Sequence, residues 1–252
     1  MAFSIVTVYW GNQKNLDVFI DHCSTFTDDI VVVYIDLFGY NIVSDKAKIV
    51  YLDHRFLLDN GYAKTFNLAR NYANNNWVYL LGVGKEITSI DQHMADRLNS
   101  STAAAYSVML EGDSTTKWLK LSNTEKTNMV GVIHEEPVPM VIMGKTFRMS
   151  EKVFATWKYT SSNYETEYEK NVCDGYRALS RLKWYHLHAT VGLKVKPQSF
   201  INSMEILHKQ WSNLHPGFLN DLFNTYEYLY SLDKTDLVEE LSKIDIWRQY
   251  QL

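Results

Sequence analysis

The stretch KTFNLARNYANNNWVYLLGVGKEITSID, residues 64–91, decides the fold of this chain. It begins as a helix, because Phe66, Ala69 and Ala73 recur on one face at helical spacing. Three asparagines at 74–76 then end the helix, since Asn tolerates the left-handed backbone found at helix C-termini.

A short buried strand follows the asparagines. Residues 77–81 are all apolar, which is typical of a parallel strand covered on both faces. The carboxyl end of this strand runs into Gly82, Val83 and Gly84, and then into Lys85. Ligands of open α/β sheets bind outside the carboxyl ends of the strands, so we expect the functional site here.

Strands and helices alternate before this stretch. Strands are predicted at 3–10, 30–35 and 49–52, and a helix over 16–23 with Asn15 as its N-cap. This alternation predicts an α/β fold whose central sheet is mostly parallel and flanked by helices.

The pattern after residue 91 is mixed. Short polar turns separate apolar strands, and longer helical spacings follow toward the C-terminus. The predicted elements are a helix at 90–98, strands at 103–110, 117–121 and 129–133, helices at 150–157 and 164–182, an extended segment at 184–195 and helical pieces from 199 onward.

The length of 252 residues allows one large domain with an appendage. We expect an α/β domain over residues 1–197 and a C-terminal helical extension over 198–252 that packs on it. The helical tail is also a surface through which a homodimer can form.

Composition excludes several classes of protein. The net charge is −4 and no basic block occurs, which argues against general nucleic-acid binding. No apolar run approaches the ~20 residues that a membrane span needs, and no signal peptide pattern opens the chain. Cys23 and Cys173 fall in helical patterns, so we expect buried free thiols and a cytoplasmic location.

The organising stretch resembles the family 2 glycosyltransferases of the GT-A fold. In that family a helix carrying Ala-Arg-Asn leads into an apolar strand that ends in an acidic Asp-x-Asp pair. Ala69, Arg70 and Asn71 match that helix, and residues 77–81 match that strand. The resemblance extends from the N-terminus to about residue 135.

The acidic pair itself is missing from this chain. Gly82 and Gly84 stand where the two metal-coordinating aspartates of the family would be, and Lys85 takes the next place. Two glycines cannot bind a metal through side chains, so the usual way of stabilising a departing nucleoside diphosphate is absent.

The resemblance implies a GT-A domain with a C-terminal helical extension and a soluble hexosyltransferase-type enzyme. Such an enzyme transfers a sugar from a nucleoside-diphosphate donor, here expected to be a UDP-sugar, to a hydroxyl acceptor such as a glycan. Thr7 and Tyr9, at the end of the first strand, are expected to frame the base, and Asp36 to hold the ribose or uracil. The residues alone leave two alternatives open: Tyr9 as a half-buried strand aromatic and Asp36 as the start of a turn.

The diphosphate is expected to lie against the glycine segment, with positive charge from Arg70 and Lys85. Arg70 can instead hold a strand-end carboxylate such as Asp36 or Asp53, and Lys85 can be a solvated loop residue.

Three options remain for the diphosphate charge. Lys85 supplies the positive charge without a metal, Mg²⁺ or Mn²⁺ is held elsewhere, or the site is inactive. A lysine in place of an acid favours the first option. Metal ligands for the second option would come from Glu86, Asp91 or His134.

The segment 131–135 is similar to a Gly-x-Ile-His-Glu stretch found in some family members. Glu135 is the candidate general base for an inverting transfer, and His134 a candidate ligand of the diphosphate or a metal. A structural hydrogen bond is the other interpretation of this pair.

A second functional class stays open. A protein that kept this fold and lost its chemistry would bind a glycan, a nucleotide or a protein partner without turnover. The missing acidic pair is the observation that favours it. No Gly-x-x-x-x-Gly-Lys-Ser/Thr, Gly-x-Ser-x-Gly or Cys-x-x-Cys motif points to any other chemistry.

Overall fold

The structure of the chain is a computed structural model that describes residues 2–131, 135–160 and 167–190, with 202, 203, 205, 206 and 209. The chain divides into two compact units, Met1–Tyr164 and Glu165–Leu252. The elements are β1 Ser4–Tyr9, α1 Gln13–Cys23, β2 Ile30–Asp36, β3 Lys48–Asp53, α2 His54–Arg70, β4 Trp77–Leu80, β5 Lys85–Ile90, α3 Gln92–Arg97, η1 Leu98–Ser100, β6 Ala103–Leu110, β7 Lys117–Asn123, β8 Thr127–Val130, β9 Glu136–Pro139, β10 Val141–Ile142, β11 Lys145–Thr146, β12 Arg148–Tyr159 and α4 Glu167–Thr190.

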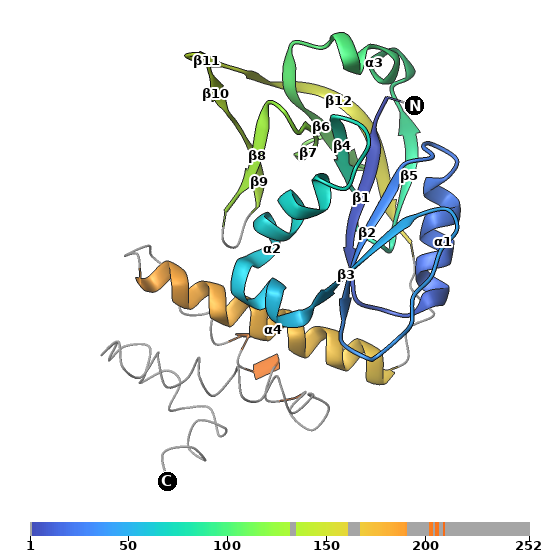
Figure 1. The fold of residues 1–252 in the computed structure, drawn as a ribbon, viewed down its shortest axis with the longest axis vertical. Helices are drawn as coiled ribbons and strands as arrows, with labels where there is room; N and C mark the ends of the chain where they lie inside the picture. Colours follow the sequence, from blue (N-terminus) through green and yellow to red (C-terminus); the bar gives the residue numbers. More distant parts are fainter. Residues whose placement is uncertain are drawn as a thin grey trace. The chain divides into compact units, whose positions relative to one another are not determined.

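An eight-stranded mixed sheet organises the first unit (Figure 1). The strands lie in the order β3-β2-β1-β4-β7-β6-β12-β5. The four strands from β3 to β4 are parallel to their neighbours, as are β6 and β12, whereas the other three pairings are antiparallel. The predicted α/β class with a helix-flanked central sheet is therefore confirmed, and its all-parallel part is the N-terminal half.

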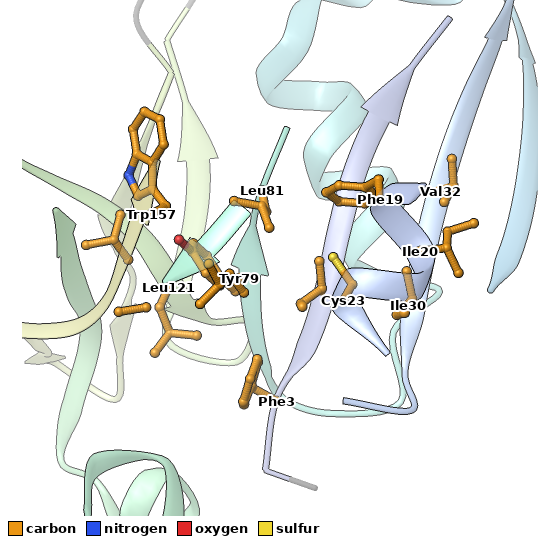
Figure 2. Close-up of a cluster of buried hydrophobic side chains, with 14 of the residues drawn as sticks. Phe3, Phe19, Ile20, Cys23, Ile30, Val32, Tyr79, Leu81, Leu121 and Trp157 are labelled. Carbon is orange, nitrogen blue, oxygen red and sulfur yellow. The ribbon is translucent and has the colours of Figure 1, made fainter. Parts of the chain in front are cut away.

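Strands β1, β2 and β4 are largely buried because helices cover both faces of the parallel half (Figure 1), whereas the edge strand β3 is exposed or half-buried along its length. Residues Ile30 to Ile35 of β2 are all buried, as the Val/Ile run predicted. The α1 residues Phe19, Ile20 and Cys23 belong to the same buried cluster as Ile30 (Figure 2). Cys23 and Cys173 are buried thiols outside any disulfide, as expected, and burial raises the pKa of the Cys23 thiol.

Helix α1 begins earlier than predicted. Its N-cap is Asn12, whose side chain accepts from the backbone N–H of Asn15 at 3.0 Å. Asn15 lies buried inside the first turn, so its predicted capping role is wrong.

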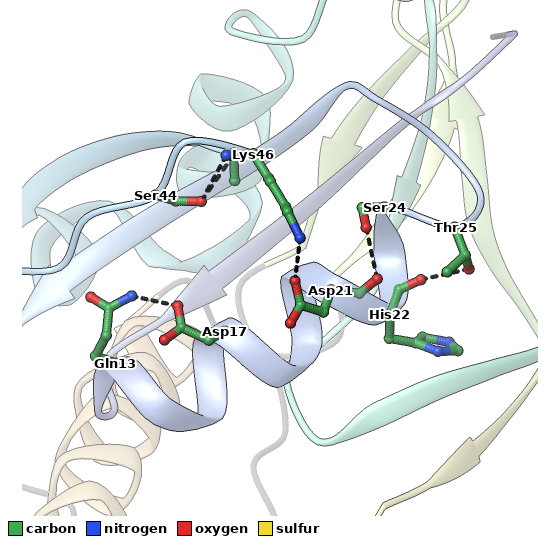
Figure 3. Close-up of polar contacts among 9 residues, drawn as sticks. Gln13, Asp17, Asp21, His22, Ser24, Thr25, Ser44 and Lys46 are labelled. Carbon is green, nitrogen blue, oxygen red and sulfur yellow. Dashed lines mark hydrogen bonds and ion pairs between the residues drawn. The ribbon is translucent and has the colours of Figure 1, made fainter.

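Polar contacts join the exposed face of α1 to the segment before β3 (Figure 3). Gln13 donates to Asp17 at 2.6 Å, and Lys46 pairs with Asp21 at 2.7 Å. Gln13 also exchanges two hydrogen bonds with the backbone of Val43. These contacts hold the connection between β2 and β3 against the helix.

Helix α2 ends at Arg70, with Asn71 as its C-cap, so the prediction that the asparagines at 74–76 end the helix in a left-handed backbone is wrong. These asparagines lie in the connection that follows, where an aspartate that the sequence did not single out fixes them. Asp29 is buried and accepts from the backbone and side-chain N–H groups of Asn74 at 2.7 and 2.9 Å. It also accepts from Asn75 at 3.2 Å and from the Ser4 hydroxyl. One carboxylate thus joins the connection after α2 to the start of β1.

Two predicted elements are wrong. Residues 150–157 belong to strand β12 and not to a helix, because β6 and β5 pair with this segment on its two sides. Residues 184–190 continue helix α4 and are not extended. Strand β5 was not predicted, although Lys85 and Glu86 begin it.

The predictions for the C-terminal part have different outcomes. The helix predicted over 164–182 is confirmed from Glu167 onward as part of α4. Most of 199–252 lies outside the described residues, so the domain boundary at 197 and the packing of 198–252 stay predictions. Among the described helices, none is long and apolar enough to cross a membrane.

Replacing Asp29 by alanine is expected to lower the free energy of unfolding by about 2–4 kcal/mol, since several donors lose a charged acceptor. Asp28→Ala is the matched control, because Asp28 is exposed and adjacent in sequence. Urea denaturation of both variants measures the difference. Equal midpoints for the two variants would show that Asp29 does not hold this connection.

Candidate functional site

The glycine segment forms a tight turn between β4 and β5. The backbone N–H of Lys85 donates to the Gly82 carbonyl at 3.1 Å, and Gly84 has a φ of +85°. A positive φ at the third residue alone defines a type II turn, which favours glycine there. The Gly84 carbonyl also accepts from the backbone N–H of Thr160 at 2.9 Å, which ties the turn to the end of β12.

This turn presents Lys85 to aromatic rings of β12. The Lys85 Nζ lies 4.4 Å from the centroid of the Trp157 ring and 5.8 Å from that of Tyr159. The side chain is half-buried, and within the described residues its ammonium makes no hydrogen bond or ion pair. The interpretation of Lys85 as a solvated loop residue is therefore wrong.

A second half-buried lysine lies close to Lys85. Lys120 is the extra residue of a bulge in β7, because Leu121 pairs with Tyr106 whereas Leu119 pairs with Ser107. Bulges change the direction in which a strand side chain points, and they are frequent beside functional sites. Like Lys85, Lys120 forms no ion pair within the described residues.

The electrostatics of these two lysines are coupled. Burial lowers the pKa of Lys85, and the positive charge of Lys120 lowers it further. Burial also lowers the pKa of Lys120, whereas the nearby Glu135 carboxylate raises it. The arrangement places two mutually repelling cations and one acid in a partly dry environment.

An aromatic wall borders the lysines. The Trp118 and Trp157 ring centroids lie 5.6 Å apart, and those of Trp157 and Tyr159 lie 4.9 Å apart with an edge-on geometry. Trp157 is buried, and Figure 2 shows it near Leu121 in the apolar cluster. Tyr159 is 66% exposed, so the wall runs from the core to the surface.

Sequence reasoning missed Lys120 and these three aromatic residues. The available signal was a lysine two residues after a tryptophan inside a strand pattern, at 118–120. The position of Trp157 was hidden by the wrong helix prediction.

The candidate alternative metal ligands have other uses. Glu86 pairs with Lys158 at 3.4 Å, and its carboxylate lies 4.0 Å from His22 Nδ1. Asp91 caps α3 by accepting from the backbone N–H of Met94 at 3.2 Å. His134 lies outside the described residues. Among the residues that the structure does describe, no three His, Cys, Asp or Glu side chains gather into a group that could hold a metal ion.

The expected nucleoside residues lie at the carboxyl ends of β1 and β2. Thr7 is buried, and its hydroxyl has no hydrogen-bond partner within the described residues. The Tyr9 hydroxyl donates to the Asn12 carbonyl at 3.0 Å, and its ring lies 6.3 Å from Tyr34. Asp36 is exposed and accepts from the backbone N–H of Gly39 at 2.7 Å, which is the geometry of a turn.

Arg70 has a structural environment. It is 4% exposed, and its guanidinium donates to the carbonyls of Asn123 and Thr127, the Thr127 hydroxyl and the Asn67 side chain at 2.8–3.3 Å. Burial lowers the pKa of Arg70 to about 10. These partners are neutral, so the alternative in which Arg70 holds Asp36 or Asp53 is wrong. The guanidinium instead binds the connection between β7 and β8.

Comparison with known proteins gives a limited result. No family model matches the sequence, and no curated protein matches it. Among solved structures, S. aureus TarS 1–349 has 11% identity and a TM-score of 0.38 over 83% of this chain and 81% of that chain. A structure of S. aureus TarS has 12% identity and a TM-score of 0.40 over 83% of this chain and 49% of that chain.

The TarS similarities are weak. At these identities and TM-scores they show neither a family nor an activity.

Removing the charge of Lys120 is expected to raise the pKa of the Lys85 ammonium toward its ordinary value. The reason is that one of the two causes that lower it disappears. Heteronuclear NMR of the lysine side chains through an alkaline titration measures the shift in Lys120→Gln.

The control for this titration is Lys117→Gln, which removes an exposed lysine from the same strand. It is expected to leave the Lys85 titration unchanged. An unshifted Lys85 in Lys120→Gln would show that the two ammonium groups do not interact.

Proposed function

We propose that this protein is a glycosyltransferase that transfers a sugar from a nucleoside-diphosphate donor, with UDP-sugars as the first candidates, to a hydroxyl acceptor. In this proposal the diphosphate leaving group binds beside the Gly82–Lys85 turn, where Lys85 and Lys120 stabilise its negative charge. The single observation that carries the proposal is the pair of half-buried lysines at the end of β4, neither of which has an ion pair within the described residues.

The physical argument starts from the cost of burying these charges. Burial disfavours both ammonium groups, and their repulsion disfavours them further. Among the described residues, Glu135 is the acid whose negative charge acts on Lys120. A bound diphosphate would supply further negative charge to both lysines. In a partly dry site such a charge pair is stronger than in water, and the same lysines would stabilise the charge that develops as the bond to the sugar breaks.

The other expected residues extend the proposal toward the nucleoside. Tyr9 ends β1, with Thr7 two residues before it, and Asp36 ends β2, so all three lie toward the same edge of the parallel half as the turn. The unpartnered Thr7 hydroxyl is a group that a ligand can satisfy. The backbone of Gly82, Val83 and Gly84 would border the diphosphate, and a role for His134 stays a prediction.

Lys85→Ala is expected to lower the rate at which UDP is released from a UDP-sugar by about 10–100-fold, because a charge-assisted contact to the diphosphate is lost. The assay offers UDP-glucose and UDP-galactose with an acceptor panel, in the presence of EDTA or of Mn²⁺. Release that survives EDTA and falls in Lys85→Ala supports charge stabilisation by lysine. The control is Lys117→Ala, which removes an exposed lysine and should retain full release.

Two results of this assay would contradict the mechanism in different ways. Strict dependence on Mn²⁺, with no effect of Lys85→Ala, would keep the enzyme and remove the lysine mechanism. Absence of release from every donor, together with calorimetric binding of UDP or a glycan, would favour the non-catalytic binding protein. The occupation of Arg70 by backbone carbonyls is the structural observation that favours this second function.

Glu135 is proposed as the general base that accepts the proton of the acceptor hydroxyl in an inverting transfer. It is half-buried and close enough to Lys120 to raise the pKa of that lysine. Glu135→Gln is expected to lower kcat by about 10²–10⁴-fold with little change in the donor KM. The exposed neighbour variant Glu136→Gln is the matched control. A Glu135→Gln enzyme with unchanged kcat would exclude this role.

A further inference from the structure

A short hairpin lies outside the large sheet. Strands β10 and β11 pair only with each other, with Val141 opposite Thr146 and Ile142 opposite Lys145. Figure 1 shows this hairpin at the far end of β12, extending away from the eight-stranded sheet. Its two-residue turn is Met143 and Gly144, with φ values of 51° and 75°. Positive φ at both positions is the type I′ turn, which favours Asn or Asp followed by Gly.

The turn position of Met143 is unfavourable in two respects. It is the only residue other than glycine with a positive φ among the described residues, a conformation that costs of order 1 kcal/mol or more in a residue with a side chain. Its side chain is also fully exposed, at 102%. Val141 and Ile142 are exposed beside it, so three consecutive large apolar side chains form the tip. Within the described residues of the first unit, no hydrogen bond, ion pair or ring contact of these three side chains accounts for this choice of residues.

The charged side chains within the hairpin segment itself all have one sign. Lys145 and Arg148 are exposed and make no ion pair within the described part of the chain. Residues 137–150 contain no Asp or Glu, although the whole chain has a net charge of −4. The nearest acids in sequence, Glu136 and Glu151, lie at the base of the segment.

We propose that residues 141–148, the hairpin tip, form a membrane-contacting element that inserts into the interface of an anionic lipid bilayer. The apolar side chains of Val141, Ile142 and Met143 would enter the boundary between headgroups and acyl chains. Lys145 and Arg148 would remain at the level of the lipid phosphates. Apolar insertion combined with attraction to anionic lipids is the general basis of interfacial binding.

The shape and charge of the tip favour a lipid surface over a second copy of the chain. The apolar residues lie at a narrow end and not on a flat face, so they can enter a fluid layer but would bury little area against a protein. A two-fold contact through the tip would bring Lys145 and Arg148 of both copies together, which like-charge repulsion opposes.

Flotation with lipid vesicles tests the proposal on the full chain. The probes are vesicles of equal parts phosphatidylcholine and phosphatidylglycerol, and vesicles of phosphatidylcholine alone. The protein is expected to float with the anionic vesicles and to be released by high salt. Lys145→Gln should weaken binding by about fivefold, the value of one cation at an anionic surface.

Met143→Asn is the decisive variant, because Asn suits the turn and removes only the apolar side chain. It should weaken vesicle binding by about tenfold or more while leaving the melting temperature unchanged or higher. The matched control is Val43→Ser, which removes an apolar side chain that is 63% exposed elsewhere on the first unit.

Three outcomes would overturn the membrane proposal. They are absence of flotation with anionic vesicles, equal flotation of Met143→Asn and the wild type, and self-association in sedimentation experiments without lipid that Met143→Asn abolishes. The last outcome would assign the tip to a contact between copies.

Discussion

The connection between β4 and β5 constrains the whole sheet. These strands are separated by β7, β6 and β12 in the strand order, which in a flat sheet corresponds to about 19 Å. The chain crosses from Leu80 to Lys85 through a tight turn, which spans at most about 14 Å. The sheet must therefore curl until β5 returns close to the end of β4. This curl brings β12, the partner of β5, against the turn and places Trp157 and Tyr159 over Lys85.

The curl buries Lys85 and Lys120 close together, and the described residues offset the free-energy cost of burying these two positive charges only in part. A cation over an aromatic face gains about 0.5–2 kcal/mol, and Glu135 favours the charged form of Lys120. Both lysines still have lowered pKa values, so the folded state releases their protons more readily than the unfolded chain. Stability contributed by these two groups therefore rises with pH only between their lowered pKa values in the folded state and the ordinary lysine pKa of 10.5. The affinity for an anion depends on the charged forms of the two lysines, so it falls as the pH rises. This opposite pH dependence distinguishes an anion-binding site from a buried charge pair that has no ligand.

The sequence predicted the parallel half of the fold because its signals are local. The Val/Ile run of β2 and the apolar run of β4 each specify a strand by themselves. Strand β12 could not be predicted in this way, since its residues become a strand through pairing with β6 and β5, which lie far away in sequence. The same limit applies to the site. Lys85 follows a recognisable strand, whereas Lys120 reaches it only because a bulge interrupts β7. Arg70 shows the opposite case. It matches the family motif, but its hydrogen bonds to Thr127 give it a structural role, which the sequence alone could not distinguish from ligand binding.

The two glycines after β4 can be separated by geometry. At Gly84 the positive φ restricts the residue type, so the turn itself accounts for glycine there. At Gly82 no such restriction exists, and an added Cβ would lie 3.8 Å from the Lys85 side chain, an ordinary contact distance. An aspartate is therefore sterically allowed at position 82. A carboxylate at that position would lie beside Lys85, pair with its ammonium and compete with any anion bound there. In the proposed function, glycine at position 82 and lysine at position 85 therefore act together, because the Lys85 charge stays available to the diphosphate.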